Sequence, residues 1–431
     1  MKTDSTKSLS KFSFTKLLCA SALSILIISA IYFSFGHRLI AAMYEGRAIP
    51  FLNQALEGSK NHPLEFYIQK GDRLFYNILI LGICGGFLFV ISTQIVGSIK
   101  SKRKAVLMNV LVFCLSLVIM LTLGEILVRK MGFKPWRPAK EKIKVSHGSH
   151  LVQIDPQLGY VTLKGNFEIT LADGYVFTVT NRRNGERITK PAEGYESNEM
   201  LPQIWIFGCS FTFGWSLNDS QTYPWILQEK LPQKNIFNFG NIGYGTLQSI
   251  VYFKELLKKE KKPEVVVYAY ASFHDERNTF LRKRRQAVGP ANELGPFRQP
   301  FARFDKSGNL IYSMTDVTYH EVPFSRQSAF VRLLEDKFNS LEDKFVHSKK
   351  ITKQLIFEFH QLAKENGIRF VVAGIDSESR DMLDWLMKQG IETVDISVDL
   401  SKKEYRNWPH DSHPNAAANQ YYAQHLEEIL K

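Results

Sequence analysis

Apolar positions are distributed unevenly along the chain. Three long runs without a charged residue, 17–35, 74–96 and 105–124, lie before position 130, and no run of this length follows. Each reaches the roughly 20 apolar residues that a helix needs to cross a bilayer core about 30 Å thick. A buried core helix of this length usually carries a polar stripe, which these runs lack. The pattern therefore predicts a membrane region over residues 1–132 with three transmembrane helices.

The first run has a second interpretation. Lys7, Lys11 and Lys16 precede it, as basic residues precede the apolar core of a signal peptide. No small-x-small cleavage pattern follows closely, so an uncleaved anchor is favoured.

Lysine and arginine in the short loops indicate the orientation. Basic residues concentrate in cytoplasmic loops. The tight loop between the second and third runs has no acid and carries Lys100, Lys102, Arg103 and Lys104. The N-terminal segment is also lysine-rich. The basic residues after the third run, among them Arg129 and Lys130, favour the opposite orientation, but two short segments agree on the first. We expect a multi-pass protein of the bacterial inner (cell) membrane, with its C-terminal domain on the periplasmic or extracellular side.

Beyond the membrane region, the polar and apolar pattern shortens. Residues 160–163 and 175–179 alternate as strands do and are separated by turn residues such as Asp173 and Gly174. We expect a small β-rich piece over residues 140–200 that packs on the following domain.

From residue 201 onward, strands alternate with helices. The predicted strands are 204–207, 236–239, 265–270, 369–373 and 392–395. Most are continuous apolar runs, as in a sheet covered on both faces. The predicted helices are 223–230, 246–259, 351–366, 380–388 and 415–430. The alternation predicts an α/β fold for residues 201–431, a three-layer α/β/α sandwich around a parallel, five-stranded, flavodoxin-like sheet.

Residues 286–341 interrupt this alternation. Their Gly and Pro content and the turn at 306–309 predict an insertion that forms a lid or cap.

Ser210 directly follows the first predicted strand. A nucleophile can be exposed at such a sharp turn from strand to helix. The alternative is that Ser210 only caps the next helix, since Ser is a favoured N-cap residue.

Two further strand ends carry candidate groups. Gly243 follows the second strand, where a glycine lets the backbone approach a ligand, and its N–H can point at a developing oxyanion. A tight turn is the alternative. His274 and Asp275 follow the third strand, where an oxyanion donor or a salt-bridged loop would fit.

The chain near its end brings a histidine beside a carboxylate. His413 lies just before Pro414, which is tolerated at the first position of a helix. Histidine is the usual general base for a serine hydroxyl, and Asp411 can orient its ring.

Together these stretches resemble the SGNH/GDSL hydrolase family, especially its bacterial membrane-anchored members. The resemblance covers about residues 201–430. The family's first motif, Gly-Asp-Ser, reads Gly208-Cys209-Ser210 here, and its last, commonly Asp-x-x-His, reads Asp411-Ser412-His413. The resemblance implies that Ser210 is the nucleophile, Gly243 an oxyanion donor, His413 the base and Asp411 the orienting acid.

The chain departs from the family pattern at three places. Cys209 replaces the Asp of the first motif, and the spacing from Asp411 to His413 is one residue shorter. His274 stands where the third motif usually has an oxyanion Asn. Imidazole can donate a hydrogen bond, but loss of one oxyanion donor typically costs about 10²–10³ in rate.

The resemblance implies a membrane-anchored serine esterase or deacetylase that hydrolyses acyl esters through an acyl-enzyme, with polysaccharides of the cell surface as candidate carriers. One alternative is O-acyl transfer at the same site. Another is a catalytically weak module that binds glycan or lipid, which His274 and the basic run 282–285 motivate. That run is otherwise a solvated loop.

Charge and cysteine content limit the partners. The net charge is +13, and much of it lies beside the predicted spans, where anionic headgroups attract it, so no nucleic acid is implied. Three of the four cysteines lie within the apolar runs. Cys209 alone belongs to the exported part, which predicts no internal disulfide there, no metal site and no cofactor.

Overall fold

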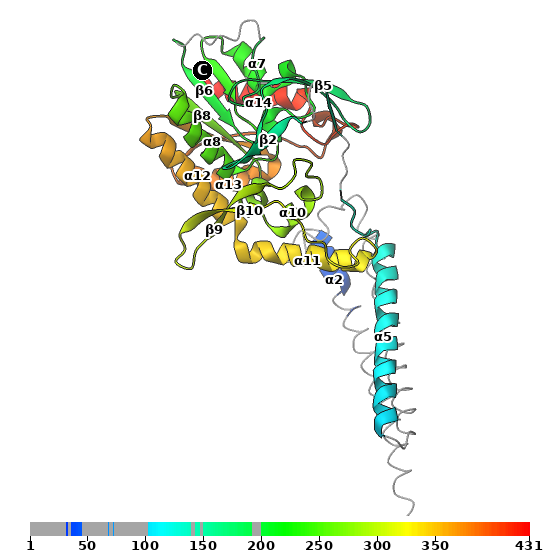
Figure 1. Ribbon diagram of the computed structural model, residues 1–431. Coiled ribbons are helices and arrows are strands. Elements are labelled where there is room, and N and C mark those ends of the chain that lie inside the picture. Colours follow the sequence, from blue (N-terminus) through cyan, green and yellow to red (C-terminus); the bar gives the residue numbers. More distant parts are fainter. Residues whose placement is uncertain are drawn as a thin grey trace, which may run out of the picture. The chain divides into compact units, whose positions relative to one another are not determined.

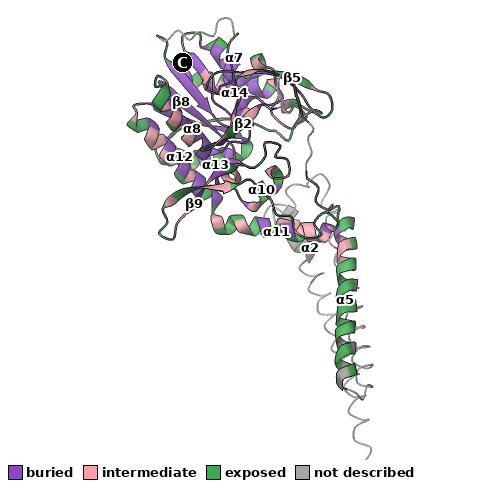
Figure 2. Cartoon of the chain, viewed as in Figure 1, coloured by how far each residue is buried: buried purple, intermediate pink, exposed green. Residues whose placement is uncertain are grey.

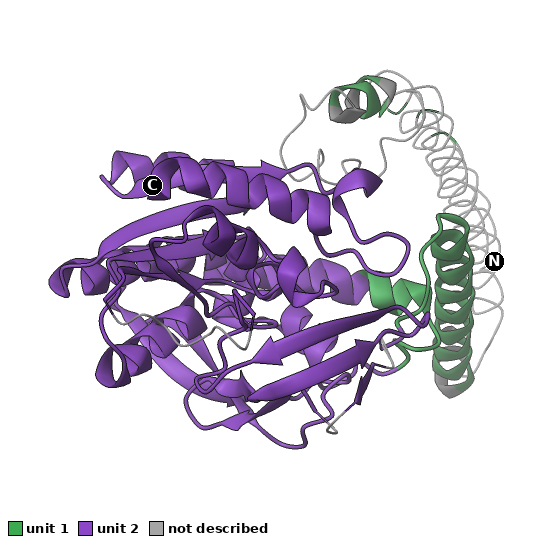
Figure 3. Cartoon of the chain, turned by 90° about the horizontal axis from the view of Figure 1, so that it is seen from above, with its two compact units in different colours: residues 1–136, 324–333 green, residues 137–323, 334–431 purple. Residues whose placement is uncertain are grey.

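The computed structural model describes residues 32, 36–44, 68, 72, 102–138, 143–146, 150–191 and 200–431. The predicted span 74–96 and nearly all of 17–35 lie outside the described residues. The chain divides into two compact units (Figure 3). The first consists of residues 1–136 and 324–333, and the second of residues 137–323 and 334–431.

The first unit contains α2 (His37–Tyr44) and α5 (Lys102–Lys130). Within α5, the segment Val106–Lys130 contains an 18-residue window with a mean hydropathy of 2.7, and none of that window is buried (Figure 2). Among the described residues, it is the one helix apolar and long enough to cross a membrane. The third predicted span falls within it. Near the end of α5, the Glu125 carboxylate accepts hydrogen bonds from the backbone N–H groups of Ala329 and Phe330, both at 2.9 Å. These are the first residues of α11 (Ala329–Val346), which Glu125 therefore caps.

The second unit is built on a parallel sheet of five strands. They are β6 (Gln203–Phe207), β7 (Asn235–Asn238), β8 (Val265–Tyr270), β11 (Arg369–Asp376) and β12 (Glu392–Val398). The order across the sheet is β12-β11-β8-β6-β7, and every pairing is parallel. Numbered along the chain this is 2-1-3-4-5, the flavodoxin-like order. The predicted fold class is confirmed.

Helices cover both faces of this sheet (Figure 1). One face carries α8 (Thr246–Lys259), α12 (Ser348–Glu365) and α13 (Arg380–Lys388), and the other carries α7 (Tyr223–Lys230) and α14 (Ala416–Leu430). The alternation of side chains along β6 explains the two layers. Trp205 and Phe207 belong to the first core and Ile204 and Ile206 to the second, and all four are buried.

The predicted β-rich piece is an antiparallel sheet and a hairpin. The sheet has the order β1-β4-β5 and consists of β1 (Lys144–Ser146), β4 (Gly165–Thr170) and β5 (Val176–Asn181). The hairpin pairs β2 (Val152–Asp155) with β3 (Gly159–Thr162). Phe177 and Val179 of β5 share a core with Phe213 and Trp215, which follow β6. The piece thus packs on the turn that carries Ser210.

Between β8 and β11 the chain forms α9 (His274–Thr279), α10 (Arg282–Val288), the antiparallel pair β9 (Arg298–Phe304) and β10 (Leu310–Asp316), and α11. The predicted insertion 286–341 contains β9 and β10 and parts of α10 and α11. The remaining short helices are α6 (Ser210–Phe213), η3 (Asp219–Gln221), η4 (Ser377–Ser379) and η5 (Lys403–Tyr405).

Candidate active site

Ser210 is the first residue of α6, three positions after the end of β6. Cys209, not Ser210, occupies the N-cap position, so the alternative of a capping serine does not describe this turn. The tightness of the turn requires Gly208, because a Cβ there would lie 2.2 Å from Thr212 Oγ1. Ser210 is thereby held at the carboxyl end of a central strand, where α/β sheets bind ligands.

The loop before α14 brings His413 to Ser210. His413 Nε2 lies 3.0 Å from Ser210 Oγ, although 203 positions separate the two residues. Asp411 Oδ1 is hydrogen-bonded to His413 Nδ1 and also accepts the backbone N–H of His413 at 2.7 Å. Its other oxygen accepts Trp215 Nε1–H at 3.0 Å. The short spacing from Asp411 to His413 is therefore compatible with an aspartate that orients the ring.

The protonation of this trio follows from its contacts. Burial alone would raise the pKa of Asp411, but hydrogen bonds and charge from His413, with the Trp215 bond, lower it below its ordinary value. Asp411 is thus a carboxylate that accepts a hydrogen bond from Nδ1–H. Nε2 is then left as an acceptor that faces the Ser210 hydroxyl.

A buried arginine organises the turn after Ser210. Arg187 is fully buried, and its Nε donates to Asp219 Oδ1 at 2.7 Å. Its other two nitrogens donate to four backbone carbonyls, those of Phe213, Gly214, Leu217 and Thr178, at 2.6–2.9 Å. The guanidinium thus ties the turn to β5. Sequence analysis did not identify Arg187, because no local pattern marks it.

Gly243 lies in the loop between β7 and α8 with φ +75°, a conformation that favours glycine. A Cβ at this position would lie 2.4 Å from the Tyr160 hydroxyl, which donates to Ile242 O at 2.6 Å. Within the described part of the chain, no acceptor is assigned to the backbone N–H of Gly243 or of Ser210. Both N–H groups are available to a ligand.

His274 is the first residue of α9 and is fully buried. Its Nδ1 lies 2.8 Å from the Tyr268 hydroxyl and 3.4 Å from Ala271 N. An amide can only donate, so Nδ1 is an acceptor and the proton resides on Nε2. Burial, with the charges of Arg277 and Arg284, holds the pKa of His274 well below its ordinary value. His274 is therefore neutral, and its buried Nε2 has no partner among the described residues.

Cys209, beside the candidate nucleophile, is a free and fully buried cysteine. Its thiol lies in the core beneath the turn and is not presented to solvent. The described residues include no group of three or more His, Cys, Asp or Glu side chains that could hold a metal ion.

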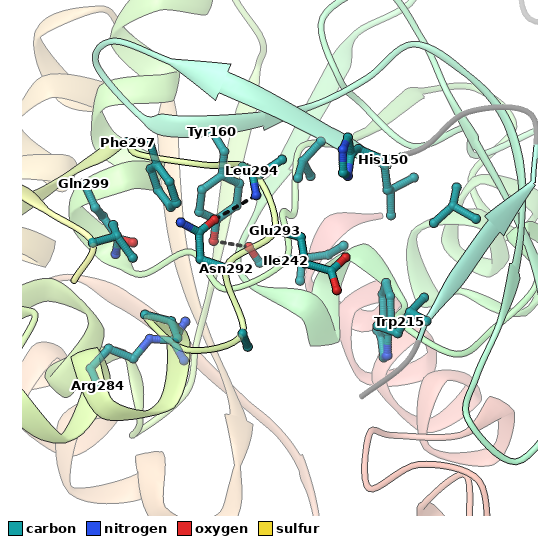
Figure 4. Close-up of a pocket in the computed structure, with 17 residues that line it drawn as sticks. His150, Tyr160, Trp215, Ile242, Arg284, Asn292, Glu293, Leu294, Phe297 and Gln299 are labelled. Atoms are coloured by element: carbon teal, nitrogen blue, oxygen red, sulfur yellow. Dashed lines mark hydrogen bonds between the residues drawn. The ribbon is translucent and has the colours of Figure 1, made fainter. Parts of the chain in front are cut away.

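A pocket of about 310 Å³ lies between the β-rich piece and the insertion. Its walls are mainly apolar, and it is lined by Tyr160 from β3, Phe297 before β9 and Arg284 from α10 (Figure 4). Trp215 and Ile242 line it too. Trp215 donates to Asp411, and Ile242 precedes Gly243, so the pocket adjoins the candidate trio. Sequence analysis did not predict it.

The basic run 282–285 is not a uniform solvated loop. Arg282 pairs with Glu335 at 2.8 Å, and Lys283 pairs with Glu276 at 2.5 Å. Arg285 donates to Thr315 Oγ1 at 3.0 Å. Arg284 has no carboxylate partner among the described residues and faces the pocket.

No family model matches the chain, and no curated protein matches it. Among solved structures, it is similar to a G-D-S-L family protein from Desulfitobacterium hafniense, with 13% identity, TM-score 0.31, and coverage of 53% of this chain and 99% of that chain.

A lipolytic G-D-S-L family member from Veillonella parvula matches with 11% identity, TM-score 0.31, and coverage of 53% of this chain and 97% of that chain. TesA matches with 13% identity, TM-score 0.32, and coverage of 53% and 98%. The first two belong to the family that the sequence motifs resemble.

Proposed function

We propose that this chain is a serine hydrolase that cleaves acyl esters, an esterase or deacetylase. The observation that carries the proposal is the chain of hydrogen bonds from Ser210 through His413 to Asp411, with 3.0 Å between Oγ and Nε2. In this chemistry, Nε2 takes the hydroxyl proton as Ser210 attacks the ester carbonyl. The protonated ring then gives that proton to the leaving alcohol, and an acyl-enzyme forms. Water, activated by the same ring, releases the acid.

The oxyanion would be held by groups that converge from three strand ends. The backbone N–H groups of Ser210 and Gly243 are the two main donors. His274 Nε2–H is a third, in the position where the resembling family has an asparagine. A neutral imidazole fixed by Tyr268 is a preorganised donor, which is the property that oxyanion stabilisation requires.

The helix α5 would anchor the enzyme in a membrane. Along most of the helix its apolar side chains are exposed in the described part of the chain, and lipid would supply their contacts. The basic loop that precedes α5 supports a cytoplasmic start, and the catalytic unit would then lie on the periplasmic or extracellular side. With the two earlier apolar runs, the protein would be a multi-pass inner-membrane enzyme, and exported acyl esters such as acylated polysaccharides would be within its reach.

The test uses the full chain purified in detergent, with 4-nitrophenyl acetate and butyrate as substrates. We expect Ser210→Ala to lower kcat/KM by at least about 10³-fold. Ser220→Ala, which changes an exposed serine ten positions later, is the matched control and should keep the wild-type rate. A fluorophosphonate probe should label wild type and not Ser210→Ala.

Three outcomes discriminate between the readings. Equal rates for wild type and Ser210→Ala would refute the assignment of the nucleophile. A folded wild type that neither hydrolyses nor labels would indicate a binding module. Acylated sugar, formed when excess acceptor is added, would indicate transfer instead of hydrolysis.

A further inference from the structure

The pocket beside the trio has an amphiphilic character. Most of its walls are aliphatic or aromatic side chains, including Leu151, Leu294 and Phe297. Trp215 and Ile242 place it next to Asp411 and Gly243, respectively. A substrate whose ester lies at Ser210 can therefore extend into this pocket. Its size is at the lower end of the range for small-molecule sites, about 300–1,000 Å³.

Arg284 contributes a positively charged guanidinium to this mainly apolar lining (Figure 4). Its one assigned hydrogen bond, from Nη2 to Gly243 O, is long at 3.4 Å, and its buried Nε has no partner among the described residues. Burial lowers the pKa of Arg284 to about 10, so the guanidinium remains charged at neutral pH. A charged guanidinium whose buried Nε–H has no partner is costly, and an anionic ligand would remove that cost.

The charged groups around Arg284 also favour the binding of an anion. Arg277 is close enough to lower the pKa of Arg284 further, and it donates to Tyr244 O at 2.9 Å. Glu276 is paired with Lys283. Glu293 also lines the pocket, but no ion pair joins it to Arg284 within the described chain. The environment of the guanidinium therefore carries an excess of positive charge.

We propose that Arg284 binds an anionic group of the substrate while the apolar walls hold its hydrocarbon part. The substrate class is then an ester that bears a carboxylate or a phosphate a few atoms from the scissile bond. The fork of the guanidinium suits both anions, because each offers two oxygens to parallel N–H groups. The presence of an ester in the ligand rests on the proposed function. The binding of an anion by Arg284 does not depend on it.

The kinetic test compares esters that differ in charge. The substrates are 4-nitrophenyl butyrate and the mono-4-nitrophenyl esters of succinate, glutarate and adipate. We expect Arg284→Gln to lower kcat/KM by about 10–100-fold on the best of the three anionic esters, the size of a charge-assisted hydrogen bond, and by less than about 3-fold on the butyrate. Lys388→Gln removes an exposed charge of α13 and should leave both values unchanged. Arg284→Lys should recover part of the loss.

Two kinetic results would overturn the inference. One is a wild type that shows no preference for any anionic ester over the butyrate. The other is an Arg284→Gln variant, with an unchanged thermal unfolding midpoint, that loses the same factor on both classes of ester, because that factor would then have no connection to substrate charge.

A binding test separates this inference from the proposed function. Saturation-transfer NMR would measure hexanoate, hexyl phosphate and neutral hexanamide on the full-length Ser210→Ala protein. We expect the two anions, but not the amide, to bind and to lose binding in the Ser210→Ala, Arg284→Gln double variant. The tighter anion identifies the group carried by the substrate. Equal binding of amide and anions would contradict the inference even if the esterase is active. Arg284-dependent binding without esterase activity would support it and refute the proposed function alone.

Discussion

Two arginines near the candidate trio, the buried Arg187 and the half-buried Arg284, differ in how far their N–H donors are satisfied. Arg187 lies beneath the turn of Ser210, and all three of its nitrogens donate hydrogen bonds, at 2.6–2.9 Å, to one carboxylate and four carbonyls. Arg284 lies beside Gly243, and among the residues that the structure describes it has a single long hydrogen bond and no carboxylate partner. The first arginine is a completed structural network. The second lies at the wall of a pocket, and its buried Nε has no partner among the described residues.

The contrast separates two tasks of the site. Arg187 holds the turn of the candidate nucleophile Ser210, and a group that only holds structure gains most from full hydrogen-bond satisfaction. The Arg284 side adjoins the pocket, and a group that recognises a ligand must keep donors free for it. Substitutions on the two sides should therefore have different signatures, one in catalysis and stability and the other in substrate choice.

The largest effect is expected on the nucleophile side, at Asp411. Asp411→Asn keeps the shape but cannot accept Nδ1–H as a carboxylate does, which favours the wrong tautomer of His413. We expect kcat to fall by about 10³–10⁴-fold for neutral and anionic esters alike. Asp399→Asn, an exposed aspartate in the preceding loop, is the control. A change of less than about 10-fold would show that Asp411 does not orient the ring.

The next effect tests the completed network directly. Arg187→Met leaves the Asp219 carboxylate and four carbonyls without their donor, so we expect the free energy of unfolding to fall by about 3–5 kcal/mol. Urea denaturation of the full chain in detergent would measure it. Arg183→Met removes an arginine whose side chain is 75% exposed and should change the value by no more than about 1 kcal/mol. Similar decreases in the unfolding free energy for both variants would contradict a structural role of Arg187.

Asp275, next to His274, offers a test by pH. Burial raises the pKa of Asp275 to about 6 from an ordinary 3.8, so the folded state prefers the protonated form. The stability contributed by this group is present below about pH 4 and is lost as the pH rises through 6. We expect Asp275→Asn to be more stable than wild type at pH 8 by up to about 3 kcal/mol, and much closer to it at pH 4. Thermal unfolding at the two pH values would measure this. A difference that does not change with pH would contradict the raised pKa.

Gly243 should show a smaller effect on the pocket side. An alanine there must adopt φ +75° and brings its Cβ 2.4 Å from the Tyr160 hydroxyl. We expect Gly243→Ala to lower the free energy of unfolding by about 1–2 kcal/mol and kcat by about 10-fold or more, since the displaced N–H is a proposed oxyanion donor. Combining it with Tyr160→Phe relieves the clash but not the backbone strain. Full recovery of kcat in the double variant would show that strain at Gly243 is unimportant.

The same division explains what the sequence could predict. All five predicted strands agree with the structure within three residues at each end, because a covered parallel strand is a continuous apolar run. Ser210, Asp411 and His413 stand in short local motifs. Arg187, Trp215 and Arg284 do not, since their environments are assembled by segments far apart in the chain. Arg284 stands in a basic run whose four members look alike in sequence and differ only in their folded partners.

The smallest effect is also the one that distinguishes the two arginines most clearly. Arg284→Met replaces a half-buried charge, which has no ion-pair partner within the described chain, by an apolar side chain of similar length. Because no carboxylate or short hydrogen bond is lost, we expect the unfolding free energy to stay constant or to rise by about 1 kcal/mol, against the loss of several kcal/mol for Arg187→Met. Urea denaturation of both variants in the same buffer measures the pair. A decrease in the unfolding free energy of Arg284→Met as large as that of Arg187→Met would mean that the folded chain itself supplies acceptors for the Arg284 guanidinium. Its donors would then not be free for an anionic ligand, and the proposed role of Arg284 would be contradicted.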